Sequence, residues 1–495
     1  TSRGATGMDE TAGQPRYRLG PRSRRGLIAG WRGGQIACVA TGLLVGIFLL
    51  RSIGGLGGLL TTVLVTSISV AAATWPLQGL SAEEWAPTIA RFALESVAEG
   101  GFRPWATRAR PARGALAHLA VRQLPGNETI GVVTDQECGT WTAVIPVGGD
   151  GFALVSEAER GERIAAWSGV LAAVASEGTG PHRLQWVART YPTLLDGPPG
   201  QAPPGIDGQI AEEEREPVRP AAALPVQGFA DPSLPAPATA YRQLLDDVAG
   251  ELWSREVLVA VTVKAALGRR AGADAAAEEV RHQLEAMSER LRAAGLHPGR
   301  PLSLRSLAAC LRRSFDLGSL GELTFWPWPV GIEDGWGWLH TDESWQATYW
   351  ISEWPRTDVG TEWLLPMLLG AGQRRTLSVT MAPVPPLRAV RRAERERTSG
   401  AADAELRRRH GFAVTARARR EQEGRQQREV ELADGHAGFR YSGYVTVTTA
   451  TFEELGEACR RVEQAAAASQ LELRRLFGSQ RDGFLCTLPV GRGCR

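Results

Sequence analysis

The chain has 495 residues, 43% of them hydrophobic, and its 56 basic and 54 acidic side chains leave a formal net charge of +2. This length suffices for about two to four domains with hydrophobic cores, and the small net charge argues against a protein whose whole surface binds nucleic acid. Only one basic residue is a lysine, Lys264, and no glycine-rich loop surrounds it. Because a P-loop needs Gly-Lys-Ser/Thr to reach the terminal phosphates, a Walker-type ATPase is excluded, as is a Schiff-base lysine elsewhere.

The most apolar stretch lies near the beginning of the chain. Residues 35–75 contain one charged side chain, Arg51, in 41 positions. A bilayer core needs about 20 helical residues, with tolerance down to about 17. The stretch therefore predicts a transmembrane hairpin over residues 34–76, with its turn beginning at Arg51. Four residues are predicted to anchor it at the membrane surfaces: Trp31, Arg32, Arg51 and Trp75.

The residues before this stretch predict its orientation. Residues 1–33 form a basic leader with seven arginines and two acidic residues. The positive-inside rule then places the leader, and everything after residue 76, in the cytoplasm. A secretory signal peptide or a buried core hairpin is the alternative, but a signal peptide would have one apolar segment near the terminus and a cleavage site. We expect a multi-pass protein of the cell membrane with two spans and both termini cytoplasmic.

The next region, residues 77–195, is predicted to be a first cytoplasmic α+β domain. Apolar patterns predict strands over residues 130–134 and 141–147, and a third over 182–189. Between them, Ser156 followed by Glu159 is a capping-box pattern for a helix ending near residue 176. Strand, strand, helix and strand in this order indicate half of a split-βαβ sheet.

A proline-rich linker is predicted over residues 196–237, followed by a second α+β domain over 238–387. In this domain we expect a buried strand at 256–263 and helices at 275–294 and 303–314. A strand at 345–351 is predicted to pair with one at 375–381. The apolar face of the first helix is predicted to contain Val280, Leu284, Met287 and Leu291.

Two further regions are predicted after residue 387. Residues 388–430 read as a charged helical arm rich in arginine. Residues 431–495 read as a C-terminal strand-helix-strand unit, with strands at 439–449 and 484–489 and a helix capped by Thr451 and Glu454. The predicted fold class is α+β: a two-helix transmembrane hairpin followed by repeated split-βαβ (ferredoxin-like) sheet-and-helix units.

Tryptophan is concentrated in residues 326–363, which contain eight of the 16 in the chain. Such a cluster could stack nucleic-acid bases, but the neighbouring acidic residues oppose a phosphate backbone. A role in the core and at a protein interface is favoured, because tryptophan is common among interface anchors. The candidate partner interface consists of Trp336, Trp338, Trp345, Trp350, Trp354 and Trp363.

No motif for catalysis, for a metal or for a cofactor stands out. The seven histidines are isolated from one another, and the six cysteines form no C-x-x-C pair. No G-x-G-x-x-G loop or G-x-S-x-G elbow is present in the expected context. We therefore expect a non-enzymatic protein without cofactor or metal, whose cysteines are buried in a reduced, cytoplasmic environment.

Several segments resemble known families. Residues 17–36 with the double span after them resemble the membrane module of PrgI-like conjugation proteins and of EccE-like actinobacterial secretion proteins. Residues 132–147, 165–170, 184–187 and 431–493 resemble the N-terminal, non-catalytic part of conjugation motor ATPases. The chain shows no P-loop domain, so no ATPase residue is assigned by this resemblance.

The resemblance implies a membrane-anchored, non-enzymatic scaffold or motor-docking platform of a conjugation-like type IV secretion system in actinobacteria. The implied partners are the lipid bilayer, a separate motor ATPase, other secretion-channel subunits and a second copy of the chain. One alternative is an EccE-like component of a type VII system. Another, for which nucleic acid would be the partner, is a DNA-handling membrane protein that uses the arginine-rich arm.

Overall fold

The computed structural model describes residues 33–74, 82–99, 102–104, 116–149, 155–192, 253–315, 327–385 and 438–493, with short gaps inside these ranges, and a few isolated residues between 388 and 424. The predicted leader, linker and charged arm therefore lie almost entirely outside the described residues. Three of the four predicted membrane anchors, Trp31, Arg32 and Trp75, lie outside them as well.

Two apolar helices begin the described chain. Helix α1 covers Gly33–Ile53 and α2 covers Gly55–Thr74. The chain reverses at Gly54 and Gly55, whose φ angles of 63° and 60° lie in the left-handed region that glycine adopts without steric cost. The turn was predicted over residues 51–55, which include Gly54 and Gly55, but its predicted start was wrong, because Arg51 lies in the last turn of α1. Arginine has a good helix propensity, whereas glycine breaks a helix.

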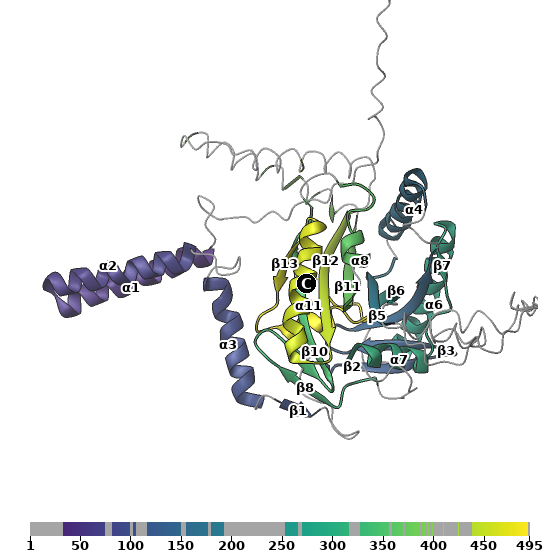
Figure 1. Cartoon of the computed structure of the whole chain (residues 1–495), viewed down its shortest axis with the longest axis horizontal. Helices are drawn as coiled ribbons and strands as arrows, with labels where there is room; N and C mark the ends of the chain where they lie inside the picture. Colours follow the sequence, from purple (N-terminus) through teal and green to yellow (C-terminus); the bar gives the residue numbers. More distant parts are fainter. Residues whose placement is uncertain are drawn as a thin grey trace, which may run out of the picture.

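A third helix, α3 (Ala82–Glu99), lies between this helix pair and the sheet. Figure 1 shows α1 and α2 side by side, projecting away from the rest of the molecule, with α3 running along its near edge. A short strand, β1 (Phe102–Pro104), follows α3 and pairs with β8 (Gly331–Asp334).

The described strands form one antiparallel sheet. Its order is β1-β8-β9-β10-β12-β11-β5-β6-β4-β3-β2, with β13 on β10 and β7 on β4. The remaining strands are β2 (Leu119–Leu124), β3 (Asn127–Asp135), β4 (Thr140–Gly148), β5 (Arg183–Pro192), β6 (Trp253–Lys264), β7 (His297–Pro298), β9 (Leu339–Thr341), β10 (Ser344–Glu353), β11 (Arg374–Val384), β12 (Gly438–Thr449) and β13 (Glu472–Arg475).

The sheet has two halves with the same order of elements. In the first, β4, α4 (Glu157–Ser176), β5, β6, α6 (Arg270–Ala293) and β7 follow one another. In the second, β10, α8 (Leu365–Leu369), β11, β12, α11 (Phe452–Ala468) and β13 do so. In each half the third strand lies between the first two, and the fourth pairs with the outer side of the first. The halves are joined where β5 pairs with β11, from Leu184 with Met381 to Thr190 with Arg375.

Each predicted internal strand and helix in the described regions is present, within a few residues of its predicted ends. The Glu159 N–H donates to Ser156 Oγ at 3.3 Å, and Thr451 and Glu454 form a complete capping box. The predicted pairing of strands 345–351 and 375–381 was wrong, because β12 lies between β10 and β11. Strand order in the chain does not fix the order in a sheet, since a later strand can insert between two earlier ones.

The predicted terminal strand at residues 484–489 was also wrong. Helix α12 (Gln480–Leu485) and a following turn occupy this region. Phe484, Leu485 and Leu488 are all buried. Two of these residues are consecutive and the third follows three positions later. This spacing fits one face of a helical turn, whereas a half-buried strand would bury every second residue.

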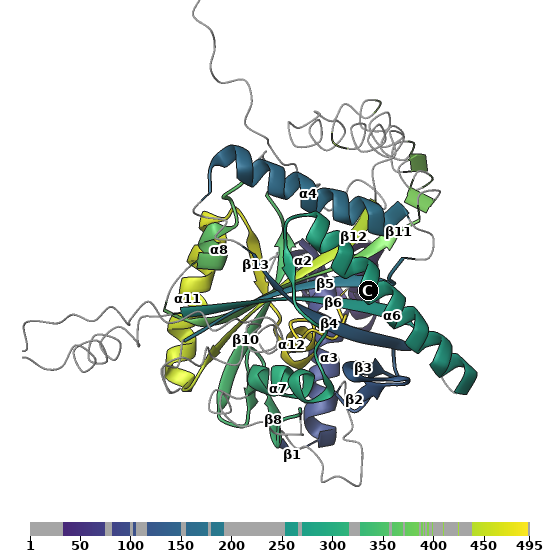
Figure 2. The ribbon, with the colours of Figure 1, turned by 90° about the vertical axis from the view of Figure 1, so that its right-hand side faces the viewer.

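Helices cover both faces of the sheet. Helices α4 and α6 in the first half, and α8 and α11 in the second, contribute to the hydrophobic clusters on one face. On that face the predicted side chains of α6, Val280, Leu284, Met287 and Leu291, are buried. On the other face α7 (Leu304–Phe315) and the segment after α12 pack against β4 and β6. Figure 2 shows the strands crossing the middle of the molecule between α11 and α6.

Candidate functional site

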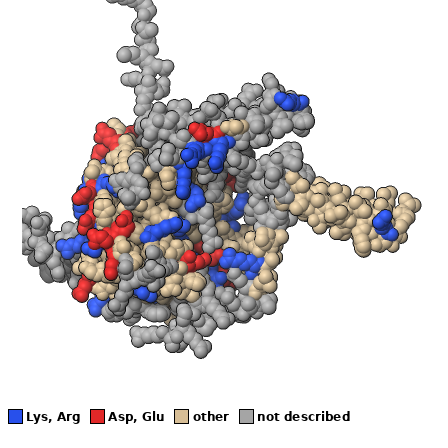
Figure 3. Space-filling model, turned by 180° about the vertical axis from the view of Figure 1, so that it is seen from behind, with Lys and Arg blue, Asp and Glu red and all other residues tan. Residues whose placement is uncertain are grey.

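The apolar surface of α1 is largely uncovered. From Gly34 to Ile53 the helix is long and apolar enough to cross a membrane, and Leu44 and Phe48 are 68% and 70% exposed. In α2 the apolar run Gly55–Ala71 is shorter than a full span. The pair is free of charge apart from exposed Arg51, and Figure 3 shows it as a tan arm with one basic patch near its far end. A core helix of a soluble protein would bury these side chains.

Small and hydroxyl-bearing residues form the contact between α1 and α2. The Gln35 side chain donates to the Ala73 carbonyl oxygen at 2.8 Å, and the Thr62 hydroxyl donates to the Gly46 carbonyl oxygen at 2.8 Å. A Cβ atom at Gly46 would lie 2.9 Å from the Thr62 methyl group. Glycine therefore allows the backbones to approach, as it does between helices packed in lipid.

The six tryptophans of the candidate partner interface do not form one cluster. The Trp338 and Trp345 rings lie 4.9 Å apart, and Trp345 stacks on His340 at 4.2 Å. The Trp354 and Trp363 rings are 6.2 Å apart at another place on the same core. These four are partly buried against the hydrophobic cluster of the second half, so their role in the core is confirmed. Their role in partner binding stays a prediction.

The other two tryptophans have separate surroundings. The Trp350 indole N–H donates to Ser442 Oγ at 3.2 Å, and the Arg474 guanidinium lies 5.6 Å from its ring centroid.

Trp336 is 37% exposed and lies beneath α3, with ring distances of 5.6 Å to Trp85 and 5.2 Å to Phe92. An ion pair of 2.8 Å between Arg91 and Asp482 lies beside it. Trp336 therefore holds α3 against the sheet.

A row of polar side chains crosses the face of the sheet opposite α6 and α11. The row runs through both halves and is buried; its members are Thr142, Thr262, Gln185, Ser378, Thr446 and Thr348. Residues 480–493, which we call the C-terminal strap, cover this row. Gln185 Nε2 donates to the carbonyl oxygens of Cys486 and Leu488, and Gln185 Oε1 accepts from the Gly491 N–H at 2.8 Å.

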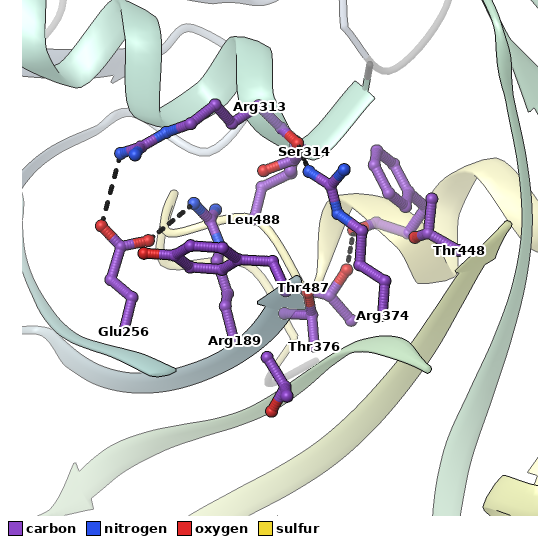
Figure 4. Close-up of a pocket in the computed structure, with 12 residues that line it drawn as sticks. Arg189, Glu256, Arg313, Ser314, Arg374, Thr376, Thr448, Thr487 and Leu488 are labelled. Atoms are coloured by element: carbon purple, nitrogen blue, oxygen red, sulfur yellow. Dashed lines mark hydrogen bonds and ion pairs between the residues drawn. The ribbon is translucent and has the colours of Figure 1, made fainter. Parts of the chain in front are cut away.

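A cavity opens on this polar face, where the two halves meet. Arg189 on β5, Glu256 on β6, Arg313 at the end of α7 and Arg374 on β11 all line it. Figure 4 shows Arg189 and Arg313 converging on Glu256, with Arg374 on the other side of the cavity. The remaining lining is mostly hydroxyl side chains, with two apolar ones, and consists of Thr190, Tyr191, Ser314, Thr376, Thr448, Phe484, Thr487 and Leu488.

The charged groups of this arginine cavity are close together, and Arg189 and Glu256 are buried. The Arg189 and Glu256 side chains are each 8% exposed, and Arg189 Nη1 lies 3.6 Å from Glu256 Oε2. Arg313 Nη2 lies 3.4 Å from Glu256 Oε1. The Arg374 guanidinium donates to the Arg313 carbonyl oxygen. Arg189 and Arg313 thus share one carboxylate, which leaves positive charge in a region of low dielectric constant.

Burial changes the pKa values around the cavity. It raises the pKa of the Tyr191 hydroxyl, with help from the Glu256 charge, and it raises the pKa of the Cys310 thiol. Burial alone would lower the pKa of Arg313, but the charge of Glu256 together with smaller effects of Cys310 and Tyr191 outweighs it, and the pKa is raised. Tyr191 and Cys310 are therefore neutral at pH 7, and Arg313 carries its charge.

The described residues contain no group of three or more histidine, cysteine or acidic side chains that could hold a metal ion. The described cysteines are all free thiols; Cys310 and Cys459 are buried, whereas Cys138 is exposed, so for Cys138 the predicted burial was wrong. It lies in the turn between β3 and β4, where hydrogen bonds to the Asp135 carboxylate fix the backbone and the thiol is not needed for packing.

Sequence reasoning missed the arginine cavity. Its four charged residues come from positions 189, 256, 313 and 374, which no motif connects. The one available signal was an arginine or a glutamate inside segments that otherwise read as buried strands, as at Arg189 and Glu256. A charge at a buried strand position needs a partner from elsewhere in the fold.

No protein-family model matches the chain, and no curated protein matches it.

Proposed function

We propose that this protein is a membrane-anchored, non-enzymatic scaffold of a conjugation-like type IV secretion system in actinobacteria. The main evidence for membrane attachment is the uncovered apolar surface of α1, where Leu44 and Phe48 are about two-thirds exposed. A large exposed apolar surface needs a lipid or protein partner, and the length of α1 matches a bilayer core.

In this proposal α2 is a second span, and the α1–α2 pair is a transmembrane hairpin. The hydrogen bonds of Gln35 and Thr62 across the pair support it, since polar side chains in lipid need partners. The seven arginines of the leader support a cytoplasmic position for residues 1–33 and for the sheet. Arg51 then lies at the opposite membrane surface.

The sheet is the cytoplasmic platform of this proposal. Its two halves share the element order strand, helix, strand, strand, helix, strand, and we infer that they are two ferredoxin-like units joined at β5 and β11. The packing of α3 on Trp336 holds this platform close to the membrane. The resemblance of several segments to the non-catalytic part of conjugation motor ATPases supports a platform on which a separate motor ATPase docks.

Membrane attachment is tested by introducing charges into α1. We expect the full chain to stay in the membrane fraction after an alkaline carbonate wash. The substitutions Leu44→Arg and Phe48→Arg together should move most of it out, since each arginine at the centre of a span costs roughly 2.5–3.5 kcal/mol of insertion free energy. The control, Val330→Arg at a 67% exposed position outside α1, should stay in the membrane. A wild-type chain released by carbonate would contradict the proposal.

The assignment to a secretion system is tested by purification from the native host in mild detergent. We expect a motor ATPase and channel subunits of a conjugation-like system to copurify with the full chain. Copurification with type VII subunits would replace the proposal by the EccE-like alternative. A folded chain that recovers neither would count against a scaffold of either machine.

A further inference from the structure

The arginine cavity contains buried donors without acceptors. Among the residues that the structure describes, Nη1 of Arg189 contacts the Cys310 carbonyl oxygen and Glu256, but Nε and Nη2 of Arg189 have no hydrogen-bond partner. Nε of Arg313 has none either. Arg189 is more than nine-tenths buried, so bulk water does not satisfy these donors. Such donors on a charged side chain are costly, which indicates that they serve to bind an acceptor group.

The balance of charge in the cavity points to an anion. Its lining contains three arginines and a single carboxylate, that of Glu256. Arg189 and Arg313 both pair with this carboxylate, so these two arginines carry one positive charge more than Glu256 balances. A buried arginine keeps its charge, so compensation must come from an added negative group.

Size and donor type narrow the class of anion. The cavity volume of about 20 Å³ is larger than one buried water molecule requires but too small for a nucleotide. Planar guanidinium groups bind oxyanions through paired N–H···O bonds. The hydroxyl groups of Thr376 and Thr448 also line the cavity and are further donors.

We propose that the arginine cavity binds a small oxyanion of the phosphate type, held by Arg189, Arg313 and Arg374 at the junction of the two halves of the sheet. Because the site lies between β5, β11 and α7, the bound anion links the two halves. This inference is independent of the secretion function proposed above.

The experiment measures the thermal unfolding of the full chain in detergent by tryptophan fluorescence, with inorganic phosphate, sulfate or chloride at equal ionic strength. We expect phosphate and sulfate to raise the unfolding temperature in a saturable way, by on the order of a few degrees, and chloride to raise it less. Glycerol phosphate is a further arm: equal binding would assign the site to the terminal phosphate of a larger molecule, and absent binding would assign it to the free ion.

Three variants test which side chains the phosphate binding depends on. Arg313→Gln should weaken phosphate binding roughly tenfold or more, because it removes a charged donor. Glu256→Gln should strengthen it, because the competing carboxylate is lost, and a general loss of stability cannot produce this opposite sign. Arg312→Gln is the matched control: Arg312 is the preceding residue on α7, but it pairs with Asp342 at a distance from the cavity, so the variant should keep wild-type phosphate binding.

Two results would overturn the proposal. One is a phosphate effect no larger than that of chloride in the wild-type chain. The other is a phosphate response that survives Arg313→Gln unchanged and falls in Glu256→Gln, because the arginines would then serve only to pair with Glu256.

Discussion

His182, just before β5, is a half-buried histidine in a basic environment. Burial, together with the charges of Arg183, Lys264 and Arg440, lowers its pKa from 6.5 to about 4. The folded protein therefore keeps His182 neutral at pH values where the unfolded chain takes up a proton. Since the unfolded state then binds more protons, the stability that depends on neutral His182 is complete above about pH 6.5. It decreases as the pH falls from there towards 4.

The prediction is that His182→Gln makes unfolding less dependent on pH. Between pH 7 and pH 5 the unfolding temperature of the wild-type chain should fall further than that of the variant, because glutamine does not titrate. Thermal unfolding followed by circular dichroism measures both. His118→Gln, at an exposed position, is the control and should retain the wild-type slope. Equal slopes for wild type and His182→Gln would contradict the prediction.

At the scale of single residues, apolar periodicity predicted which apolar side chains are buried, whereas no sequence pattern predicted which polar side chains are buried. The spacing of Val280, Leu284, Met287 and Leu291 identified a buried helix face, because hydrophobic burial depends on local pattern. Gln185 and Arg189 are equally buried, yet their partners come from α7 and the C-terminal strap. The sequence around a polar residue does not indicate whether a distant segment will supply its hydrogen bonds.

Among the elements, α3 depends on a small aromatic contact. Its Trp85 and Phe92 rings pack on Trp336, and Trp85 also lies 6.1 Å from Phe477. Gly478, at a φ of 66°, leaves the space for this contact, since a Cβ atom there would lie 2.7 Å from the Trp336 ring. The position of α3 relative to the sheet therefore depends on a few side chains near one edge.

We predict that Trp336→Ala releases α3 while the sheet stays intact. The loss should be about 1–3 kcal/mol of packing free energy, less than for a fully buried tryptophan because Trp336 is partly exposed. Hydrogen exchange should show reduced protection of the α3 amides and unchanged protection of β10 and β12. Trp350→Ala is the matched control, because Trp350 contacts Ser442 and Arg474 instead of α3. Full protection of α3 in Trp336→Ala would contradict the prediction.

The sequence predicted most strands and helices of this fold but not how the strands are ordered in the sheet. Strands β4, β6 and β12 were recognisable from runs of β-branched residues, and α11 from its capping box. The insertion of β12 between β10 and β11 was not, because strand pairing depends on contacts far apart in the chain. The terminal α12 was mistaken for a strand, since a short apolar run fits either structure.

For the whole molecule, the C-terminal strap is a second connection between the halves, besides the pairing of β5 with β11. Gln185 contacts Ser378 across the β5–β11 junction as well as three residues of the strap. Arg492, in the same strap, pairs with the buried carboxylate of Asp135 at 2.7 Å. The two halves therefore share a hydrogen-bond network that cannot open in one half alone.

We predict that Gln185→Met lowers the stability of both halves together, by about 2–4 kcal/mol, because it leaves several buried polar groups without partners. Urea unfolding followed by tryptophan fluorescence and by circular dichroism should give one coincident transition at a lower midpoint. Ser352→Ala, which removes a single hydrogen bond to the Glu472 carbonyl oxygen within the second half, should cost about 1 kcal/mol. Two separate transitions in the wild-type chain would contradict a shared network.

The position of the strap in the chain also sets an order of events during translation. Helix α1 leaves the ribosome more than 400 residues before the strap does, an interval of roughly 20–90 s at ordinary rates of synthesis. A nascent chain held at the membrane would carry an unfinished sheet for that time. The row of threonine, serine and glutamine side chains that the strap later covers can be solvated by water during this interval. Leaving this polar row uncovered until last reduces the aggregation that a wholly apolar exposed face would cause.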